Sequence, residues 1–433
     1  MLTQQAPPKF DVLVLGGGPG GATAALALAR KGLSVAVVDR LTFPHFHIGE
    51  SFLPRNLQLI KELGLEERLL ALPQVEKHGA EFAMGHGEEL GSISFSEGLI
   101  DGETYAFNIE RAPFDAMLLD AAKDAGAHLF LGVAAKSFPR LADGDVAVVL
   151  EDGRTLEGRY LLDASGQSTV LGKHLGLRHV LSDLKKVAYF GHFHHVERPP
   201  GRQGGYIRIA MCDEGWFWLI PIDEERTSIG LVLDATFAKT AGVAPNQMLA
   251  WAIARCPYVE RLCRHATFPP ENGTIADFSY RCEPYAGPGY FLLGDAATFI
   301  DPIFSTGVCL AMMSAVHLAD GLAAMIAGET TAEKVRADYV RYVDGSSSAF
   351  FRMVRLFYRH AFRDVLLEED APLGVRRAVI SLLAGEVFPR PSWAVRWRLA
   401  IFLLFVRLQP FWAVAPRKRR WSLFAAESGA RTK

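Results

Sequence analysis

The chain has 433 residues, of which 50% are hydrophobic and 22% charged, with a formal net charge of −2. It can bury a large core, and its charge balance gives no electrostatic reason to expect nucleic-acid binding. The five cysteines are odd in number and scattered, without zinc-ligand spacing. This favours free thiols in a reducing compartment and no metal site. The polar N-terminus, MLTQQAPPKF, does not resemble a secretory signal, so we expect a cytoplasmic protein.

The first forty residues predict a strand, a glycine-rich turn, a helix and a second strand. Residues 11–15 are an apolar run typical of a buried parallel strand, residues 23–30 should form the helix, and residues 34–38 the second strand. The helix N-terminus would present unpaired N–H groups to phosphates. This order of elements is that of a βαβ dinucleotide-binding unit.

Each glycine of the G-x-G-x-x-G turn has a physical role. Gly16 permits the tight turn, Gly18 lets the backbone approach a pyrophosphate, and Gly21 lets helix and strand pack closely. Asp39 ends the second strand, 18 positions after Gly21, where its carboxylate can accept hydrogen bonds from a ribose. Dinucleotide binding is therefore predicted with its acidic partner in place.

Two later segments also place small and acidic residues after a strand. GRYLLDASGQST (158–169) puts Asp163 at a strand end, and GYFLLGDAATFIDPIFSTGVCLAM (289–312) puts Asp295 there. In the second segment a small-residue helix should begin near Thr306 and direct its positive end at whatever lies above it. Such a carboxylate can hold a ribitol hydroxyl, which favours FAD over NAD.

Together the three segments resemble the FAD-dependent monooxygenase superfamily over residues 9–330. The resemblance implies an α/β fold: a glutathione-reductase-type FAD-binding Rossmann domain, an inserted mixed β-sheet substrate domain and a C-terminal helical region. The expected limits are 1–75, 108–185 and 275–330 for the FAD module, 76–107 and 186–274 for the substrate sheet, and 331–433 for the helical cap. The expected FAD-contacting residues are Gly16, Gly18, Pro19, Gly20, Gly21, Asp39, Arg40, Gly49, Glu50, Ser51, Arg111, Asp163, Ala164, Ser165, Gly166, Asp277, Gly294, Asp295 and Pro302.

Four stretches narrow the family. HIGESFLP (47–54), VEKHGAEF (75–82), GWFWLIPI (215–222) and FIDPIFSTGV (299–308) follow one another. In this order they resemble the flavin-dependent halogenases, and most closely the branch that acts on phenols and pyrroles, free or bound to a carrier protein. The W-x-W-x-I-P motif is carried by Trp216 and Trp218, followed by Ile-Pro.

The resemblance implies a reaction and its participants. FADH2 from a separate flavin reductase would react with O2 to give a C4a-hydroperoxide, which oxidises chloride or bromide to hypohalous acid. Ser305, Thr306 and Gly307 match the halide-binding loop, and Lys77 matches the lysine that hydrogen-bonds the oxidant or forms a chloramine. Trp216 and Trp218 would fill the space beside the flavin that a hydroxylase leaves for its substrate. Partial burial would lower the lysine pKa and free its amine.

Some positions keep two interpretations. Phe304 replaces a glutamate of the tryptophan halogenases, which argues against free tryptophan as substrate. Asp277 matches an acid common in the phenol/pyrrole branch and could form an ester with the flavin or serve only as a hydrogen-bonding acid. The two tryptophans could simply be one packed face of a strand. The histidines of HFHHV (192–196) alternate along a strand, which favours a strand without metal.

The C-terminal hundred residues predict helices, with aromatic and arginine residues interleaved in WAVRWRLAIFLLFVRLQPFW (393–412). The apolar run is too short to span a membrane. It could be a helix over the substrate opening, an interfacial helix with a basic anchor at 417–420, or a docking surface for an acidic carrier protein. For the whole chain, the competing functions are a flavin hydroxylase or dehydrogenase, an alkene reductase of the geranylgeranyl type, and a non-catalytic flavin-binding protein.

Overall fold

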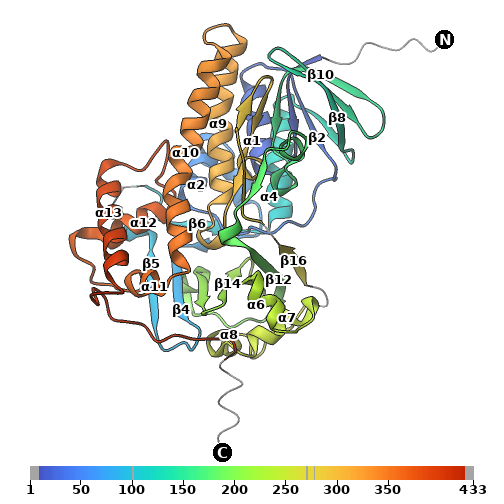
Figure 1. Ribbon diagram of the computed structural model, residues 1–433. Coiled ribbons are helices and arrows are strands. Elements are labelled where there is room, and N and C mark those ends of the chain that lie inside the picture. Colours follow the sequence, from blue (N-terminus) through green and yellow to red (C-terminus); the bar gives the residue numbers. More distant parts are fainter. Residues whose placement is uncertain (1–8, 100–101, 270–271, 277, 425–433) are drawn as a thin grey trace, which may run out of the picture.

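The computed structural model describes residues 9–99, 102–269, 272–276 and 278–424 (Figure 1). Two large sheets lie one above the other, and a long pair of helices runs from beside the upper sheet to beside the lower one. The protein has the α/β class and the Rossmann-type arrangement that the sequence predicts. The residue limits expected for the three parts remain a prediction.

The upper sheet is parallel at its centre, as expected from its continuous apolar strands. Its main order is β18-β19-β10-β1-β2-β7, and the β8–β9 hairpin extends from β10. Its strands are β1 (Lys9–Leu15), β2 (Val35–Asp39), β7 (His128–Leu131), β8 (Ala135–Ala142), β9 (Asp145–Leu150), β10 (Thr155–Asp163), β18 (Ala286–Gly287) and β19 (Tyr290–Leu292).

The first helix, α1 (Pro19–Arg30), starts four residues before the predicted position. Proline at the first helical position has no N–H to lose and a suitable φ, so the helix extends back into the glycine turn. It packs against α4 (Arg111–Asp124) and α9 (Gly307–Ile326). Helix α9 is apolar and long enough to span a membrane by composition, but it packs between α1 and α10 (Ala332–Phe357), as a core helix does.

The lower sheet is mixed, with the order β16-β12-β15-β14-β13-β4-β5 and one parallel pair, β13–β4. Helices α6, α7 and α8 cover one face of it (Figure 1). The opposite face carries Trp216 and Trp218 toward the C-terminal helices. Bounds are β4 (Gly79–Met84), β5 (Leu90–Ser94), β12 (Lys186–His194), β13 (Ile207–Met211), β14 (Gly215–Pro221), β15 (Arg226–Asp234), β16 (Gly273–Ala276), α6 (Ala235–Thr240), α7 (Pro245–Ile253) and α8 (Pro257–Leu262).

Short elements connect the two sheets. They include a two-stranded pair, β3–β6, and a small sheet, β11-β17-β20. Their bounds are α2 (Pro54–Glu62), α3 (Glu66–Leu70), β3 (Val75–Lys77), β6 (Ala106–Asn108), α5 (Val170–His174), β11 (Arg178–Val180), β17 (Tyr280–Cys282) and β20 (Thr298–Phe299).

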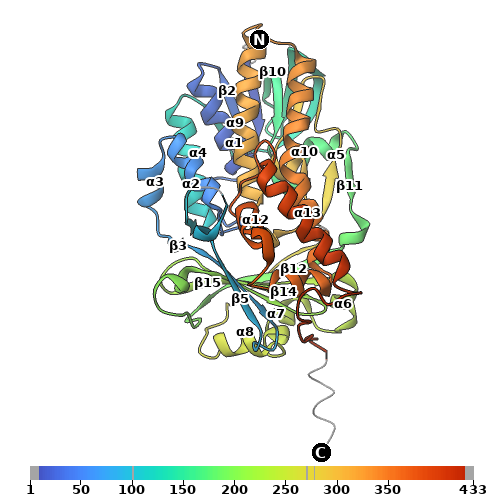
Figure 2. The same cartoon turned by 90° about the vertical axis from the view of Figure 1, so that its left-hand side faces the viewer.

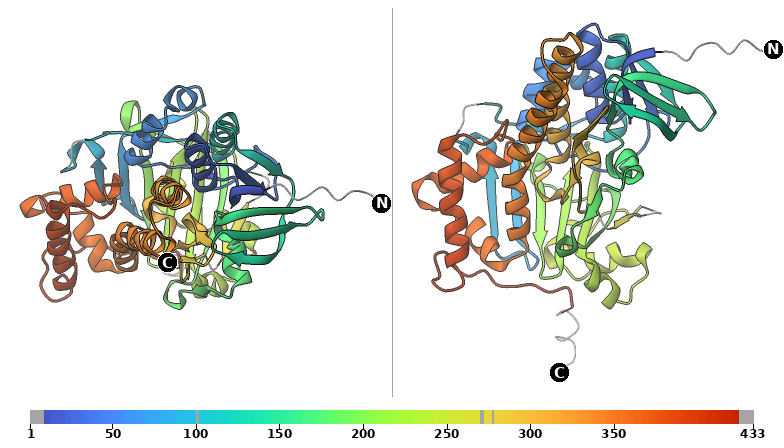
Figure 3. Two further views of the ribbon diagram at one scale, coloured as in Figure 1. Left: turned by 90° about the horizontal axis from the view of Figure 1, so that it is seen from above. Right: turned by 45° about the horizontal axis from the view of Figure 1, so that its top comes forward.

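The C-terminal region is helical, as predicted. Helices α11 (His360–Leu366), α12 (Val375–Leu383) and α13 (Trp393–Leu408) form a group beside β4 and β5 (Figure 2). They lie on the opposite side of the molecule from the β8–β9 hairpin (Figure 3). The C-terminal helices therefore cover the lower sheet and leave the outer edge of the upper sheet free.

Candidate active site

The carboxyl ends of four parallel strands meet at one edge of the upper sheet. Leu15 pairs with Asp163, Asp163 with Leu292, and Leu15 with Val38. The glycine turn, the Asp163 loop, Asp39 and the Gly294–Asp295 turn therefore lie side by side. Three motifs that are far apart in the sequence come together there, as a ligand at the crevice of an open α/β sheet requires.

The glycine turn has the shape of a phosphate cradle. Gly16 has φ +102°, and a Cβ on it would lie 2.3 Å from the carbonyl oxygen of Ala164. A Cβ on Gly21 would lie 1.9 Å from the oxygen of Gly16, so both positions require glycine. A Cβ on Gly18 would meet nothing within 4 Å, which leaves the surface of the turn open. This open turn at the start of α1 fits the pyrophosphate of a dinucleotide.

Two of the three acidic residues at this edge already have hydrogen-bond partners. Asp39 accepts hydrogen bonds from the backbone N–H groups of Gly17 (2.7 Å) and Leu41 (2.8 Å) and so fixes the turn, while the neighbouring Arg40 is exposed. Asp163 is buried and accepts from the N–H groups of Ser165 and Leu171, which shapes its own loop. Asp295 is half-buried, and burial raises its pKa to about 6 against the opposing effect of Arg111.

Arg111 is buried at the start of α4. Its Nε and Nη2 donate to the two oxygens of Asp115 at 2.8 Å each, and its Nη1 donates to the carbonyl of Ile48. A Cβ on Gly49, which has φ +111°, would lie 3.0 Å from Arg111 Nη1. The arginine thus supports the 48–50 loop from beneath.

Several buried polar atoms near this loop have no hydrogen-bond partner within the described chain. Three of them belong to Glu50 (Oε2), Ser51 (Oγ) and Asn108 (Oδ1). Because buried polar groups are normally paired, these atoms indicate a polar ligand that the chain itself does not supply. Together with the open glycine turn, they fit bound FAD.

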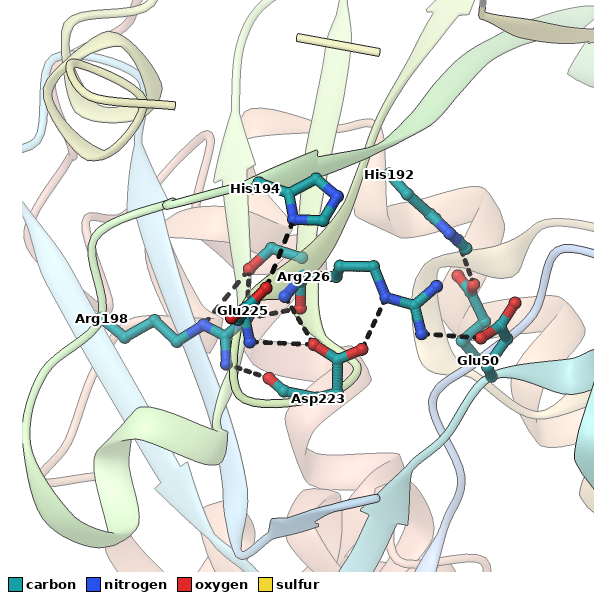
Figure 4. A network of polar contacts seen from close by, with 9 residues as sticks. Glu50, His192, His194, Arg198, Asp223, Glu225 and Arg226 are labelled. Carbon is teal, nitrogen blue, oxygen red and sulfur yellow. Dashed lines mark hydrogen bonds and ion pairs between the residues drawn. The ribbon is translucent and has the colours of Figure 1, made fainter. Parts of the chain in front are cut away.

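Glu50 also joins the upper part of the molecule to the lower sheet. Its Oε1 lies 2.5 Å from Nε2 of His192 on β12, and Glu50 is fully buried. Burial lowers the pKa of His192, but Glu50 outweighs that effect and raises it above the usual value. Figure 4 shows this pair beside Arg226, which bonds both Asp223 and Glu110.

Figure 4 also shows His194, a second histidine of HFHHV. His194 lies 3.9 Å from Glu225, near Arg198. It is two residues from His192 and therefore on the same face of β12, whereas Phe193 between them points to the other face. No group of three or more histidine, cysteine or acidic side chains suited to a metal is found among the described residues. All five cysteines are buried and unpaired.

Lys77 lies at the end of β3 and is only 1% exposed. Its Nζ donates to the carbonyl of Phe52 at 2.9 Å and lies 5.3 Å from the ring centroid of Phe95. No acidic group forms an ion pair with it among the described residues. Burial lowers its pKa from 10.5 to about 7, because desolvation disfavours the ammonium form. The sequence analysis expected partial burial of Lys77, whereas the structure buries it completely.

Trp216 and Trp218 point from β14 to the same face, with ring centroids 5.9 Å apart. Both are buried, and each indole N–H has a partner: Tyr358 for Trp216 at 3.1 Å and Ser228 for Trp218 at 3.2 Å. A Cβ on Gly230 of the paired strand would lie 2.1 Å from the Trp218 ring. Glycine at 230 therefore leaves the space that Trp218 fills. We call the two packed indole rings of Trp216 and Trp218 the tryptophan wall.

The 301–307 loop ends at α9. Ser305 adopts a left-handed conformation with φ 54°, and Thr306 and Gly307 begin the helix, whose first N–H groups have no intrahelical acceptor. A cavity of about 50 Å³ beside Asp295, Thr306 and Gly307 extends to α10. It has room for a water-sized group.

Asp301 and Tyr358 connect this loop to the tryptophan wall. Tyr358, which follows α10, donates to Asp301 Oδ2 at 2.5 Å and accepts from Trp216. The Ile303 N–H donates to Asp301 Oδ1 at 3.0 Å, which holds the turn at Pro302. Burial raises the pKa of Asp301 to about 6, and its two donors oppose the rise.

The sequence did not indicate Asp301, Tyr358, Gly230 or His192 as parts of the site. Gly230 had one weak signal, a glycine inside a strand of apolar residues, which often marks a close approach. Nothing local marks Tyr358, because its partners are 57 and 142 positions away. Asp277 lies outside the described residues, so its proposed role remains a prediction.

Comparisons with known proteins place this chain and its fold in a family. Residues 9–341 match the family model of the FAD binding domain. The chain is 32% identical over 370 residues to a tryptophan 2-halogenase of Chondromyces crocatus, covering 82% of this chain and 69% of that one. It is 29% identical to a 1H-pyrrole-2-carbonyl-[peptidyl-carrier protein] brominase of Pseudoalteromonas luteoviolacea, over 89% of this chain and 94% of the other.

A solved structure agrees with the sequence relatives. The structure of the flavin-dependent brominase Bmp2 superposes with a TM-score of 0.83 and 27% identity, over 93% of this chain and all of that one. The chain therefore has the fold of the FAD-binding flavoprotein oxidoreductases. It belongs to the flavin-dependent halogenases and is an FAD-dependent oxidoreductase.

Proposed function

We propose that this halogenase oxidises chloride or bromide at the 305–307 loop and delivers the oxidised halogen through Lys77 to an electron-rich aromatic substrate. The observation that carries the proposal is a fully buried lysine whose pKa falls to about 7 without an ionic partner in the described chain. When bound, FADH2 with O2 supplies the two-electron oxidant that converts halide to hypohalous acid. The chain's residues then hold the halide, carry the halogen and exclude competing reactions.

Lys77 can act in either protonation state near neutral pH. As a neutral amine it attacks the halogen of hypohalous acid, forming an N–halogen bond and releasing water. As an ammonium it donates a hydrogen bond to the intact acid. The pKa near 7 makes both forms available, and the fixed contact with the Phe52 carbonyl orients the amine.

The halide would lie against the backbone N–H groups of Thr306 and Gly307, with Ser305 turning the chain into the helix. A helix N-terminus attracts an anion without a cationic side chain. The cavity beside Thr306 and Gly307 supports this position. The tryptophan wall would block direct contact between substrate and flavin, which favours halogen transfer over oxygen transfer.

The substrate we propose is a phenol or pyrrole, free or bound to an acyl carrier protein. The name of one relative, a brominase of carrier-bound pyrrole carboxylate, supports the carrier-bound form. Phe304 in place of an acid is the argument against free tryptophan as substrate. Because one relative is named a tryptophan 2-halogenase, tryptophan must still be tested beside the other substrates. A separate flavin reductase would supply FADH2, since the sequence contains no second G-x-G-x-x-G turn.

The proposal can be tested without knowing the substrate. Reduced enzyme is mixed with O2 in a stopped-flow instrument, with bromide, with chloride, or with sulfate at equal ionic strength. We expect bromide or chloride, but not sulfate, to accelerate the return of oxidised-flavin absorbance. A rate independent of halide would contradict halide oxidation. If halide is oxidised, pyrrole carboxylate on a carrier protein, free phenols and tryptophan are then compared as acceptors.

A further inference from the structure

Helix α13 presents apolar residues on two opposite faces. Its inner face, with Val395, Leu399, Phe402 and Val406, is buried against the other C-terminal helices. Helical geometry places Trp393 and Leu404 on the opposite side, and their side chains are 72% and 48% exposed. A surface helix normally turns a polar face to water. The outer face of α13 therefore lacks the expected polar cover.

The exposed apolar surface continues beyond the end of the helix. Phe411 and Trp412 follow directly, and they are 79% and 67% exposed. Figures 1 and 2 show α13 at the outside of the molecule. We call Trp393, Arg396, Leu404, Arg407, Phe411 and Trp412 the α13 surface. Sixteen helical residues at 1.5 Å each give the helical part a length of about 24 Å.

The charge of this part of the chain has one sign. Residues 387–424 include no aspartate or glutamate, and their basic residues are Arg390, Arg396, Arg398, Arg407, Arg417, Lys418, Arg419 and Arg420. Arg396 and Arg407 are exposed and form no ion pair with any described residue, whereas Arg419 pairs with Glu88. The α13 surface thus combines protruding aromatic side chains with unpaired positive charge.

We propose that the α13 surface binds an anionic lipid membrane, with α13 lying parallel to the membrane plane. The aromatic residues would enter the interfacial region, and the arginines would lie at the level of the lipid phosphates. A second copy of the chain fits poorly, because two α13 surfaces face to face would bring like charges together. Aromatic side chains that protrude from the surface also suit a soft interface better than a rigid protein groove.

The full-length, FAD-loaded enzyme is sedimented with vesicles of phosphatidylcholine alone and with vesicles that also contain phosphatidylglycerol. We expect it to bind the anionic vesicles much more strongly and to be released by salt. Each basic residue near an anionic surface is worth about fivefold in binding. The variant Arg396→Gln/Arg407→Gln/Arg417→Gln, which also removes the exposed Arg417 just beyond the α13 surface, should therefore bind on the order of 100-fold more weakly. Phe411→Ala/Trp412→Ala should bind roughly tenfold more weakly or worse.

Matched controls distinguish loss of the α13 surface from loss of charge or of an exposed apolar side chain elsewhere on the protein. Lys136→Gln/Lys173→Gln/Lys185→Gln removes three exposed charges elsewhere, and Leu70→Ser removes an exposed apolar residue. Both controls should bind vesicles like the unmodified enzyme. Equal binding to the two kinds of vesicle, or anionic binding that survives the α13 substitutions, would overturn the proposal.

Two further outcomes would also overturn it by assigning the surface another partner. If the enzyme ignores vesicles and Phe411→Ala/Trp412→Ala converts an oligomer to a monomer in light scattering, the surface joins copies of this chain. If the enzyme ignores vesicles and the α13 substitutions weaken binding of a purified acidic acyl carrier protein, the surface docks a protein. Halide-dependent flavin oxidation is measured in parallel and should be unchanged in every variant, which keeps this test separate from that of the proposed function.

Discussion

Lys77 and the α13 surface are opposite departures from the usual distribution of residues. Lys77 is an ionisable side chain held in an apolar interior, and Trp412 is a large apolar side chain held in water. The first arrangement destabilises the folded protein because the ammonium loses its hydration. The second changes stability little, because an exposed side chain has a similar environment in the folded and unfolded chains. A buried ionisable side chain therefore indicates a catalytic role, and an exposed large apolar side chain indicates a binding partner.

The largest expected effect comes from removing the buried amine. Lys77→Met keeps the length of the side chain and should lower halogenation by on the order of 1,000-fold, because the halogen loses its acceptor. It should also raise the free energy of unfolding at neutral pH by about 2 kcal/mol, after allowing for the unpaired Phe52 carbonyl. Urea denaturation and product formation measure the two effects. Lys136→Met, at an exposed lysine, is the control and should change neither.

The pH dependence of halogenation should identify the working form of Lys77. If the neutral amine acts, the rate falls about tenfold per pH unit below the pKa near 7. If the ammonium acts, the rate falls above it. We expect the first profile, because the apolar site favours the neutral amine. Stability follows the same group: the folded pKa lies below the unfolded value of 10.5, so the destabilisation is absent above pH 10.5, grows as pH falls and is complete below about 7. A profile without an inflection near 7 would contradict a titrating Lys77.

A second buried ionisable group, Asp301, differs from Lys77 because donors surround it. Tyr358→Phe removes one donor, so the pKa of Asp301 should rise. The 301–307 loop should also lose the Tyr358 hydrogen bond that connects it to the tryptophan wall, which we call the brace. We expect the halide KM to rise about tenfold with kcat nearly unchanged, since one buried hydrogen bond to a charged group is worth roughly 1.5 kcal/mol or more. Tyr339→Phe, which loses a 2.7 Å bond to the Leu292 carbonyl, should lower stability without changing the halide KM. Equal effects of the two variants would refute the brace.

The smallest expected effect comes from removing one exposed side chain of the α13 surface. Trp412→Ala should change the free energy of unfolding by less than about 0.5 kcal/mol, because the side chain is 67% exposed. Denaturant titration in the absence of lipid is the measurement. A loss above about 2 kcal/mol would show that Trp412 contributes to folding, and the contrast with Lys77 would then fail.

Local patterns predicted the parts of the fold and site whose geometry depends on a few neighbouring residues. In the glycine turn, Gly16 has a positive φ and Gly21 closely approaches the Gly16 carbonyl, so the local sequence was sufficient there, although the close contact of Gly16 with Ala164 joins distant segments. Lys77 could be proposed only through resemblance, because three residues of β3 cannot reveal whether their lysine is buried. The brace through Tyr358 depends on how α10 packs against the loop, and no local pattern records that packing. The exposed face of α13 needed the structure for the same reason, since periodicity alone does not tell which of two apolar faces is buried.

The bond between Tyr358 and Asp301 also sets an order of assembly during synthesis. The chain is made from its N-terminus, so the glycine turn, Lys77, the tryptophan pair and Asp301 all emerge before Tyr358 does. A nascent chain can form its cofactor cradle early, but its halide loop is tied to the wall only after α10 is complete. An incomplete chain therefore lacks the hydrogen bond that connects the halide loop to the tryptophan wall, and this contact can form only late in synthesis.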